Sequence, residues 1–190
     1  VYLVSRSFES MKNVVVISSS LRRGSNSDAL AEEFARGARD AGNSVEKISL
    51  AGKKLEFCRG CLACQELGKC VINDDANTVM EKVLAADVVV FATPIYYYEM
   101  SGQLKTLLDR LNPMFPLDYK FRDAYLLCSA TEDEANTPER AIHGFEGWVE
   151  CFEKCRLAGT VFAGGVTDPG EVSVHPALKK AYDMGFSVAH

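Results

Sequence analysis

The sequence predicts a three-layer α/β domain, in which one parallel sheet carries helices on both faces. Apolar, β-branched runs alternate along the chain with segments whose apolar residues recur at helical spacing. The 190 residues correspond to about one domain. Of these, 47% are hydrophobic and 25% are charged, which is typical of a folded globular protein. No linker, internal repeat or low-complexity stretch divides the sequence.

The first predicted strand is Val14–Ile17, a continuous β-branched run of the kind that a parallel sheet buries on both faces. Ser27 or Asp28 is suited to be the N-cap of the following helix. Apolar residues at helical spacing then follow: Leu30, Phe34, Ala38 and Ala41. Gly42-Asn43 is a typical helix end, and Val45–Leu50 is the second predicted strand.

The middle of the chain begins with a cysteine-rich segment that has no clear period. Asp74-Asp75 then opens a helix, and Val88–Ala92 is the third and most obvious strand. We expect Pro94 to end this strand, because proline lacks the N–H that a sheet ladder needs. Ser101–Leu111 reads as the next helix, with four leucines on one face.

The last third repeats the alternation of strand and helix. Ala124–Cys128 is the fourth predicted strand, and Pro138 starts a long helix. Thr160–Ala163 is the fifth strand, and the last helix begins at about Pro176. Five strands with right-handed crossovers favour the flavodoxin-like order 2-1-3-4-5 over a nucleotide-binding order that needs a sixth strand. Ligands of such sheets bind at the carboxyl ends of the strands, so chemistry is expected in the loops that follow Ile17, Ala92 and Cys128.

Charge and composition exclude several classes of function. The formal charge of −5 offers no basic excess for a nucleic-acid backbone, and no apolar run is long enough to cross a membrane. Residues 1–10 precede Met11, the expected natural start, and we interpret them as a non-native or disordered extension, with residues 11–190 as a single domain. Without an export signal the expected location is the cytoplasm, where seven cysteines do not indicate a disulfide framework. For Cys128, Cys151 and Cys155 we expect small buried side chains.

The loop after the first strand predicts a phosphate site. Ser18–Ser27 holds five hydroxyls, one amide and two guanidinium groups, and it leads into a helix N-terminus with free N–H groups. It contains neither the glycine pattern of a dinucleotide site nor that of an NTPase. The alternative is a polar surface turn that only caps the helix.

The loop after the third strand predicts a site for a flat ring. Three consecutive tyrosines, Tyr96, Tyr97 and Tyr98, could cover the faces and edge of a heterocycle. They could also pack against a neighbouring subunit. Lys105, Asp109 and Arg110 on the next helix are compatible with a plain solvated face.

In these two loops the chain resembles the flavodoxin-fold NAD(P)H-dependent FMN reductases. The resemblance rests on Ser20–Ser27 and on Thr93–Tyr96 followed by Ser101–Lys105 and Asp109-Arg110. In that family the first loop binds the FMN phosphate and the second lies along the isoalloxazine and ribityl chain. The resemblance implies a phosphate site at Ser20, Arg22, Ser25, Asn26 and Ser27, and a ring site at Pro94, Ile95, Tyr96, Tyr97 and Tyr98.

The sequence departs from the family in two places. Ser19 stands where the family often has glycine before the first loop. The loop after the fourth strand, often glycine-rich in the family and close to the flavin edge, reads Ser129, Ala130 and Thr131 and then Glu132–Glu134. This acidic run should disfavour the 2′-phosphate of NADPH. The segment Gly164–Glu171 resembles a region that we associate with assembly more than with catalysis.

Four cysteines form the sharpest motif of the sequence. Cys58, Cys61, Cys64 and Cys70 have the spacing C-x₂-C-x₂-C-x₅-C, and four thiolates are the full ligand set of a [4Fe-4S] cluster. The motif resembles that of the iron–sulfur flavoproteins, a branch of the same family. A zinc site, redox-active thiols, and a cysteine loop that holds no cluster remain open alternatives.

The expected function is that of an FMN-dependent oxidoreductase, which passes electrons from NAD(P)H to a quinone, another flavin or a nitroaromatic. No acid or base need be essential, so no catalytic residue is named. The alternative is an electron carrier in which a [4Fe-4S] cluster and FMN exchange electrons with ferredoxin. A non-redox binding module is disfavoured, because receiver domains place acidic residues where this chain has Ser18–Arg22. The resemblance also implies a homodimer or homotetramer.

Overall fold

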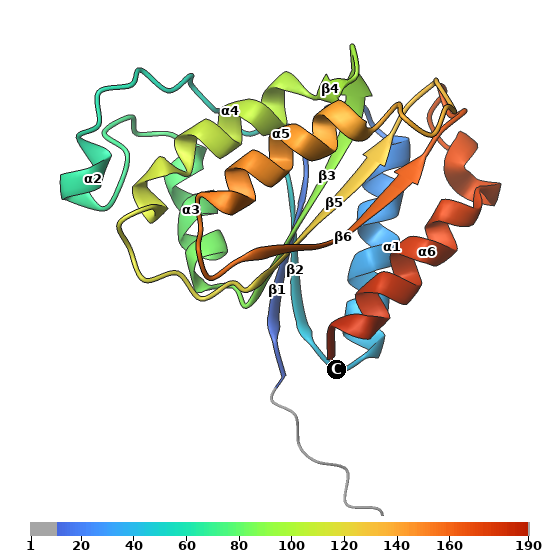
Figure 1. The fold of residues 1–190 in the computed structure, drawn as a ribbon, viewed down its shortest axis with the longest axis horizontal. Helices are drawn as coiled ribbons and strands as arrows, with labels where there is room; N and C mark the ends of the chain where they lie inside the picture. Colours follow the sequence, from blue (N-terminus) through green and yellow to red (C-terminus); the bar gives the residue numbers. More distant parts are fainter. Residues whose placement is uncertain (1–10, 190) are drawn as a thin grey trace, which may run out of the picture.

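A computed structural model of the chain describes residues 11–189, so the extension expected at residues 1–10 lies outside the described part. Its central sheet is built from the apolar runs of the sequence. The parallel strands are β1 (Asn13–Ser18), β2 (Ser44–Ser49), β3 (Val88–Tyr96), β5 (Asp123–Ser129) and β6 (Arg156–Ala163). They pair in the order β2-β1-β3-β5-β6 (Figure 1). Counted by parallel strands alone this is the order 2-1-3-4-5, so the predicted flavodoxin-like fold is confirmed.

The end of β3 differs from the prediction. Pro94 does not stop the strand, which continues to Tyr96 and turns into β4 (Glu99–Met100), an antiparallel partner of Ile95 and Tyr96. The reason is the side to which proline faces. Ala92 accepts a hydrogen bond from Ser19 on the β1 side, and hydrogen-bonding direction alternates along a strand. Pro94 therefore faces the side on which β1 has already ended, and its missing N–H breaks no ladder bond.

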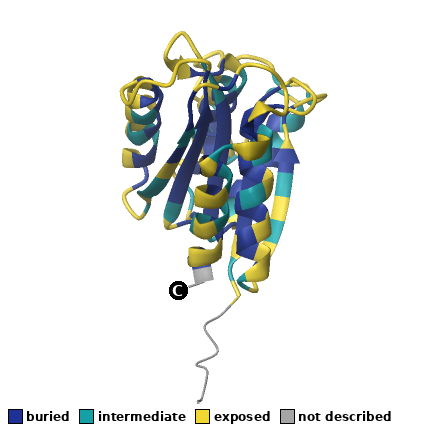
Figure 2. Cartoon of the chain, turned by 90° about the vertical axis from the view of Figure 1, so that its right-hand side faces the viewer, coloured by how far each residue is buried: buried dark blue, intermediate teal, exposed yellow. Residues whose placement is uncertain are grey.

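Two layers of helices enclose the sheet. On one face α1 (Asn26–Asp40) and α6 (Pro176–Phe186) cover Val14, Val16 and their neighbours. On the other face α3 (Asp75–Ala85), α4 (Gly102–Arg110) and α5 (Glu139–Glu150) cover Val15, Ile17 and Phe91. Figure 2 shows buried strands between helices whose outer faces are exposed. The short helical pieces are α2 (Cys64–Leu67) and the 3₁₀ turns Asn112–Met114, Glu171–Val174 and Ser187–Ala189.

Helix α1 begins earlier than the sequence predicts and lies unusually close to α6. Its N-cap is Ser25, not Ser27 or Asp28, because the Ser25 hydroxyl accepts a hydrogen bond from the Asp28 N–H at 3.1 Å. A Cβ on Gly37 would lie 2.1 Å from the carbonyl oxygen of Tyr182, and one on Gly185 would lie 2.1 Å from that of Phe34. The two glycines thus allow backbone-to-backbone contact between the helices.

Candidate functional site

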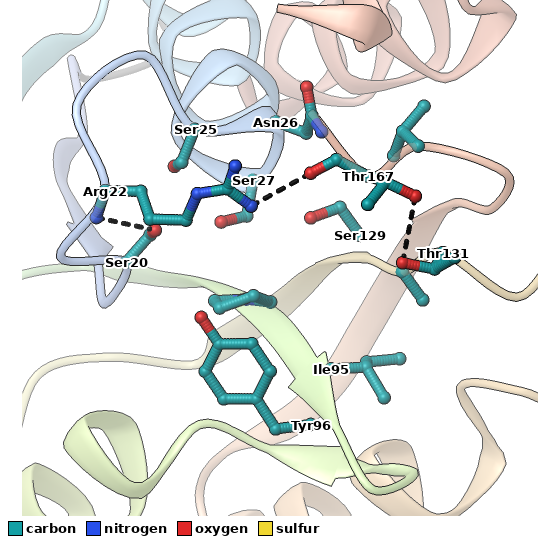
Figure 3. Close-up of a pocket in the computed structure, with 13 residues that line it drawn as sticks. Ser20, Arg22, Ser25, Asn26, Ser27, Ile95, Tyr96, Ser129, Thr131 and Thr167 are labelled. Atoms are coloured by element: carbon teal, nitrogen blue, oxygen red, sulfur yellow. Dashed lines mark hydrogen bonds between the residues drawn. The ribbon is translucent and has the colours of Figure 1, made fainter. Parts of the chain in front are cut away.

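The carboxyl ends of β1, β3, β5 and β6 converge on a pocket of about 420 Å³, including space open to solvent (Figure 3). Parallel strands bring their carboxyl ends to one edge, so loops far apart in sequence meet there. The lining residues are Ser20, Arg22, Ser25, Asn26, Ser27, Pro94, Ile95, Tyr96, Ser129, Ala130, Thr131, Val166 and Thr167. The structure therefore brings together eleven of the thirteen residues that the sequence predicts for a cofactor site. The two that it leaves out are Tyr97 and Tyr98.

The first wall is the turn that enters α1. Ser25 caps the Asp28 amide and Ala29 bonds to the Ser25 carbonyl. The amides of Asn26 and Ser27, which lie in the first turn of the helix, cannot be paired within it. The Ser27 hydroxyl is buried and has no hydrogen-bond partner among the described residues. This wall thus presents a hydroxyl, two N–H groups and the positive end of the helix dipole to the pocket.

Arg22 and Asn26 join this turn to the loop after β6. Arg22 donates from Nη1 to the Thr167 carbonyl at 2.9 Å, and its guanidinium lies across the pocket (Figure 3). The Asn26 amide oxygen accepts from the backbone N–H of Gly170 and of Val172, both at 3.2 Å. Its Nδ2 donates to the Asp168 carbonyl at 3.0 Å. The Asn26 side chain is therefore occupied in holding a loop, and the phosphate contact predicted for Asn26 is left to its backbone N–H.

The second wall is the end of β3. Pro94, Ile95 and Tyr96 line the pocket, and the Tyr96 ring is half exposed (Figure 3). Tyr97 and Tyr98 form the turn to β4 with φ values of 51° and 66°, in the left-handed region that disfavours residues other than glycine. Tyr97 is 99% exposed, so this turn directs its side chain away from the pocket.

A buried hydroxyl network behind this wall was not anticipated from the sequence. The Ser19 hydroxyl donates to the Ala92 carbonyl at 2.9 Å and lies 3.0 Å from the Ser101 hydroxyl. The Thr93 hydroxyl accepts from the Ser101 N–H at 2.9 Å. Together they tie β1, β3 and the start of α4 at the edge that carries the pocket. Ser19, where the family often has glycine, is the residue that connects the network to β1.

The third wall comes from the loops after β5 and β6. Ser129, Ala130 and Thr131 face Val166 and Thr167, and the hydroxyls of Thr131 and Thr167 are 3.1 Å apart. The segment Gly164–Glu171, which we associate with assembly more than with catalysis, thus supplies two pocket residues, and its part in assembly stays a prediction. The segment reaches the pocket because β6 ends at the same edge of the sheet as β1, which no local sequence pattern shows.

Gly164 shows how closely these loops approach each other. A Cβ on Gly164 would lie 2.7 Å from the Asp133 Cα and 2.9 Å from the Glu132 carbonyl oxygen. The carboxylates of Glu132, Asp133 and Glu134 lie on exposed residues beside the rim of the pocket. Among the described residues that line the pocket, none is a His, Cys, Asp, Glu or Lys. The lining offers hydroxyls, an amide and a guanidinium, which are groups that bind a ligand.

The four cysteines lie away from this pocket, in loops that project beyond α3 and α4 around α2 (Figure 1). Cys58 and Cys61 are exposed, Cys64 is buried and Cys70 is half-buried. In residues 11–189 no three His, Cys, Asp or Glu side chains are arranged to hold a metal ion. The thiol donors suit an iron–sulfur centre chemically, but this arrangement does not gather them, and the cluster remains a prediction.

Two expectations about other residues are corrected. Arg110 is not part of a solvated face, nor does it lie along the pocket: its side chain is fully buried in an ion pair with Asp74. Lys105 and Asp109 do form an exposed pair. Cys151 is exposed at the end of α5 rather than buried, whereas burial of Cys128 raises the pKa of its thiol to about 12.

Comparison with known proteins gives this arrangement a context. A family model described as NADPH-dependent FMN reductase matches residues 12–139. The chain is 36% identical over 135 residues to an iron–sulfur flavoprotein of Methanocaldococcus jannaschii, covering 70% of each chain. It is 32% identical over 178 residues to a Bacillus subtilis protein to which an NAD(P)H-dependent FMN-containing oxidoreductase activity is ascribed, covering 88% of this chain and 93% of that protein.

Solved structures agree on the fold. An NAD(P)H:quinone oxidoreductase from Methanothermobacter marburgensis superposes with a TM-score of 0.70, covering 95% of this chain and 98% of that one. Its sequence identity is 20%, so this likeness concerns the fold alone. No helix between residues 11 and 189 has the length and apolar character needed to cross a membrane.

Proposed function

Because the chain belongs to the NADPH-dependent FMN reductase family, we propose that the pocket at the carboxyl edge of the sheet is its FMN site. The chain is an oxidoreductase of that family and uses FMN with NAD(P)H as co-substrate. All walls of the pocket belong to one sheet and its loops, which supports a single FMN-binding domain over residues 11–190.

One observation carries the placement of the phosphate: the buried Ser27 hydroxyl that has no partner in the described structure. A buried hydroxyl without a hydrogen bond is costly, so its presence in a pocket indicates a ligand oxygen. Ser27 lies beside unpaired first-turn amides and the Arg22 guanidinium. Hydroxyl, amides and guanidinium are all donors, which matches a terminal phosphate with its three acceptor oxygens.

The ring of the flavin fits between the second and third walls. Pro94, Ile95 and Tyr96 offer an apolar and aromatic surface, and Ser129–Thr131 offer backbone groups and hydroxyls opposite to it. When bound, FMN supplies hydride acceptance from a nicotinamide and electron transfer to an acceptor. The residues around it bind and orient, in agreement with a described lining that contains no His, Cys, Asp, Glu or Lys.

The acceptor that this site supports is a small planar molecule such as a quinone, another flavin or a nitroaromatic. The pocket is open to solvent beside the exposed ring of Tyr96, so a second flat molecule can approach. A homodimer or homotetramer in the cytoplasm is the assembly and location that we propose with this function.

Two variants test the phosphate site. Charged hydrogen bonds contribute about 1.5–3 kcal/mol each, so Arg22→Ala with Ser27→Ala should weaken FMN binding about 100-fold or more. Riboflavin, which lacks the phosphate, should bind to the double variant and to the unchanged protein alike. Arg23→Ala is the matched control, because Arg23 is an exposed neighbour that does not line the pocket. Unchanged FMN affinity in the double variant would refute the assignment.

A second function is favoured by the four-cysteine loop, which we define as residues 50–74. Four thiols within thirteen residues, together with the relatives named iron–sulfur flavoproteins, support an electron carrier with a [4Fe-4S] cluster and ferredoxin as partner. Purification without oxygen, followed by absorption spectroscopy and iron and sulfide analysis, separates the two functions. Flavin bands with about four irons per chain support the carrier, whereas flavin bands alone support the reductase without a cluster.

A further inference from the structure

Hydrogen bonds hold the two ends of the four-cysteine loop, residues 54–56 and 72–75, which we call its feet. The chain that leaves β2 pairs with the start of α3: the Lys54 N–H donates to the Asp75 carboxylate at 2.7 Å, and the Asp75 N–H donates to the Lys54 carbonyl at 3.1 Å. The Glu56 N–H donates to the Asp74 carboxylate at 2.8 Å. The thirteen residues that carry the cysteines therefore begin and end at fixed points.

Arg110 of α4 hydrogen-bonds to both feet. Its side chain is fully buried, and Nη1 and Nη2 each donate to a different oxygen of Asp74 at 2.8 Å. Nη1 also donates to the Glu56 carbonyl at 2.6 Å, and Nη2 to the Ile72 carbonyl at 3.3 Å. One guanidinium thus binds the residues just before the first cysteine and just after the last. Lysine, a point donor, cannot reproduce this forked geometry.

Donor groups also approach the sulfur atoms themselves. Asn112 Nδ2 lies 3.1 Å from the Cys64 Sγ, and the Gly60 N–H lies 3.4 Å from the Cys58 Sγ. Asn77 accepts from the Cys70 N–H at 3.0 Å and donates back to the Cys70 carbonyl at 3.1 Å. Hydrogen bonds to sulfur are one of the means by which proteins set the properties of metal–thiolate centres.

The charge of Arg110 is directed at the same loop. Burial lowers the pKa of Arg110, but its interactions with Asp74 and Cys70 outweigh burial and raise it, so the group stays cationic. Its Nε is buried and has no partner in the described part of the chain.

We infer that Arg110 is the positioning residue of the four-cysteine loop: its buried guanidinium holds both feet and thereby sets where Cys64 and Cys70 lie. The inference rests on the second function proposed above. It adds a role for a residue outside the cysteine motif, and it makes a statement about the metal-free protein that can be tested separately.

The metal-free protein tests the positioning role. In Arg110→Lys and Arg110→Met the feet should separate, and alkylation of Cys64 and Cys70 by iodoacetamide should become at least about tenfold faster, while that of the exposed Cys58 and Cys61 changes little. FMN affinity should stay within about twofold, which shows that the variants fold. Arg156→Met, which removes an exposed arginine with a surface partner, is the control. Unchanged alkylation of Cys64 and Cys70 overturns the role of Arg110.

Reconstitution with iron and sulfide tests whether a metal centre depends on the held loop. Loss of an outer residue of a metal site typically weakens metal binding about 10–100-fold, and Arg110→Met should release iron to a chelator faster by a factor in that range. Arg110→Lys should show a loss in the same range, because its feet are expected to separate as well. Asn112→Leu, which removes only the donor on Cys64, should show a smaller loss and covers the case in which an Arg110 variant does not fold.

The outcomes separate the two proposals. If the unchanged protein takes up no iron and sulfide, the carrier function fails, while the alkylation rates still decide the positioning role. If the centre forms and its stability is the same in Arg110→Met, the carrier function stands and the inference about Arg110 is overturned.

Discussion

The pocket proposed for FMN and the four-cysteine loop illustrate opposite relations between closeness in sequence and closeness in space. The pocket takes its lining from segments as distant as Ser20 and Thr167, yet they meet in one hollow. The cysteines lie within thirteen residues and are not gathered. The difference is the scaffold: parallel strands deliver the pocket loops to one edge, whereas the cysteine loop is fixed at its feet alone. Residues that follow neighbouring strands of one rigid sheet are therefore more reliably close in space than residues that are only close in sequence.

The largest expected effect concerns the feet of the loop. Asp74→Asn leaves the buried Arg110 without its charged partner, and we expect the free energy of unfolding in urea to fall by about 3–5 kcal/mol. Asp123→Asn, which removes an exposed pair with Arg156, should cost about 1 kcal/mol or less. FMN affinity should be unaffected by Asp74→Asn. Equal losses in the two variants would contradict the special role of the feet.

The same pair predicts a dependence on pH. Burial alone would raise the pKa of Asp74, but hydrogen bonds from Arg110, Glu56 and Ala76 lower it below that of an ordinary aspartate. A lowered pKa stabilises the folded state above the pKa of a free aspartate, about 3.9, and that stabilisation is lost as the pH falls through the folded value. The difference in unfolding free energy between the unchanged protein and Asp74→Asn should thus be constant from pH 8 to about pH 5 and shrink below about pH 4.

A smaller effect is expected at the rim of the pocket. Gly164→Ala places a Cβ against the backbone of Asp133 and Glu132, so stability should fall by about 1–3 kcal/mol and FMN should bind more weakly. Gly147→Ala is the control, since it lies in α5 with open space around it and should raise stability by about 0.5–1 kcal/mol. Urea unfolding and FMN titration measure both. Unchanged FMN affinity in Gly164→Ala would show that the third wall is not held by this contact.

The cap of α1 should contribute about 1 kcal/mol. Ser25→Ala removes the acceptor of the Asp28 N–H at the turn that forms the first wall. Thermal unfolding should show the loss, and FMN should protect the variant less than it protects the unchanged protein. Ser173→Ala, at an exposed position in the turn before α6, should stay within about 0.5 kcal/mol.

The smallest effect is a gain. Tyr97→Asn with Tyr98→Gly puts the residues preferred by this type of tight turn at two left-handed positions, and stability should rise by about 0.5–1 kcal/mol. Tyr97→Ala should give no such gain, because alanine is strained there as well. Because neither tyrosine lines the pocket, FMN affinity should not change. A fall in affinity would show that the tyrosines contribute to the ring site, as the sequence predicts.

The sequence was a good guide to everything that the sheet dictates. Apolar runs identified the five parallel strands, and their order follows from crossover handedness, so the loops that carry Ser20, Tyr96 and Ser129 could be placed at one edge. It was a poor guide where a residue's partner lies far along the chain. Helical spacing says nothing of Asp74, so the sequence does not reveal that Arg110 is buried in an ion pair with it.

Two further details near the site have the same origin. The side chain of Asn26 has the chemistry of a phosphate ligand, but three backbone groups of residues 168–172 occupy it, and no local pattern reveals them. Pro94 was expected to end β3, because proline is excluded from ladders paired on both sides. Which side is still paired at that point depends on where β1 ends, which is a property of the neighbouring strand.

The hold of Asn26 on Gly170 and Val172 has a consequence for the order in which the molecule folds. These bonds join residues 144 and 146 positions apart, and the close contact of Gly37 with Tyr182 spans a similar distance. Contacts between remote segments close the largest loops and therefore form late. In a refolding experiment the helical signal should recover first, and capture of the flavin should mark the final step, when the last stretch of chain closes over the turn at the start of α1.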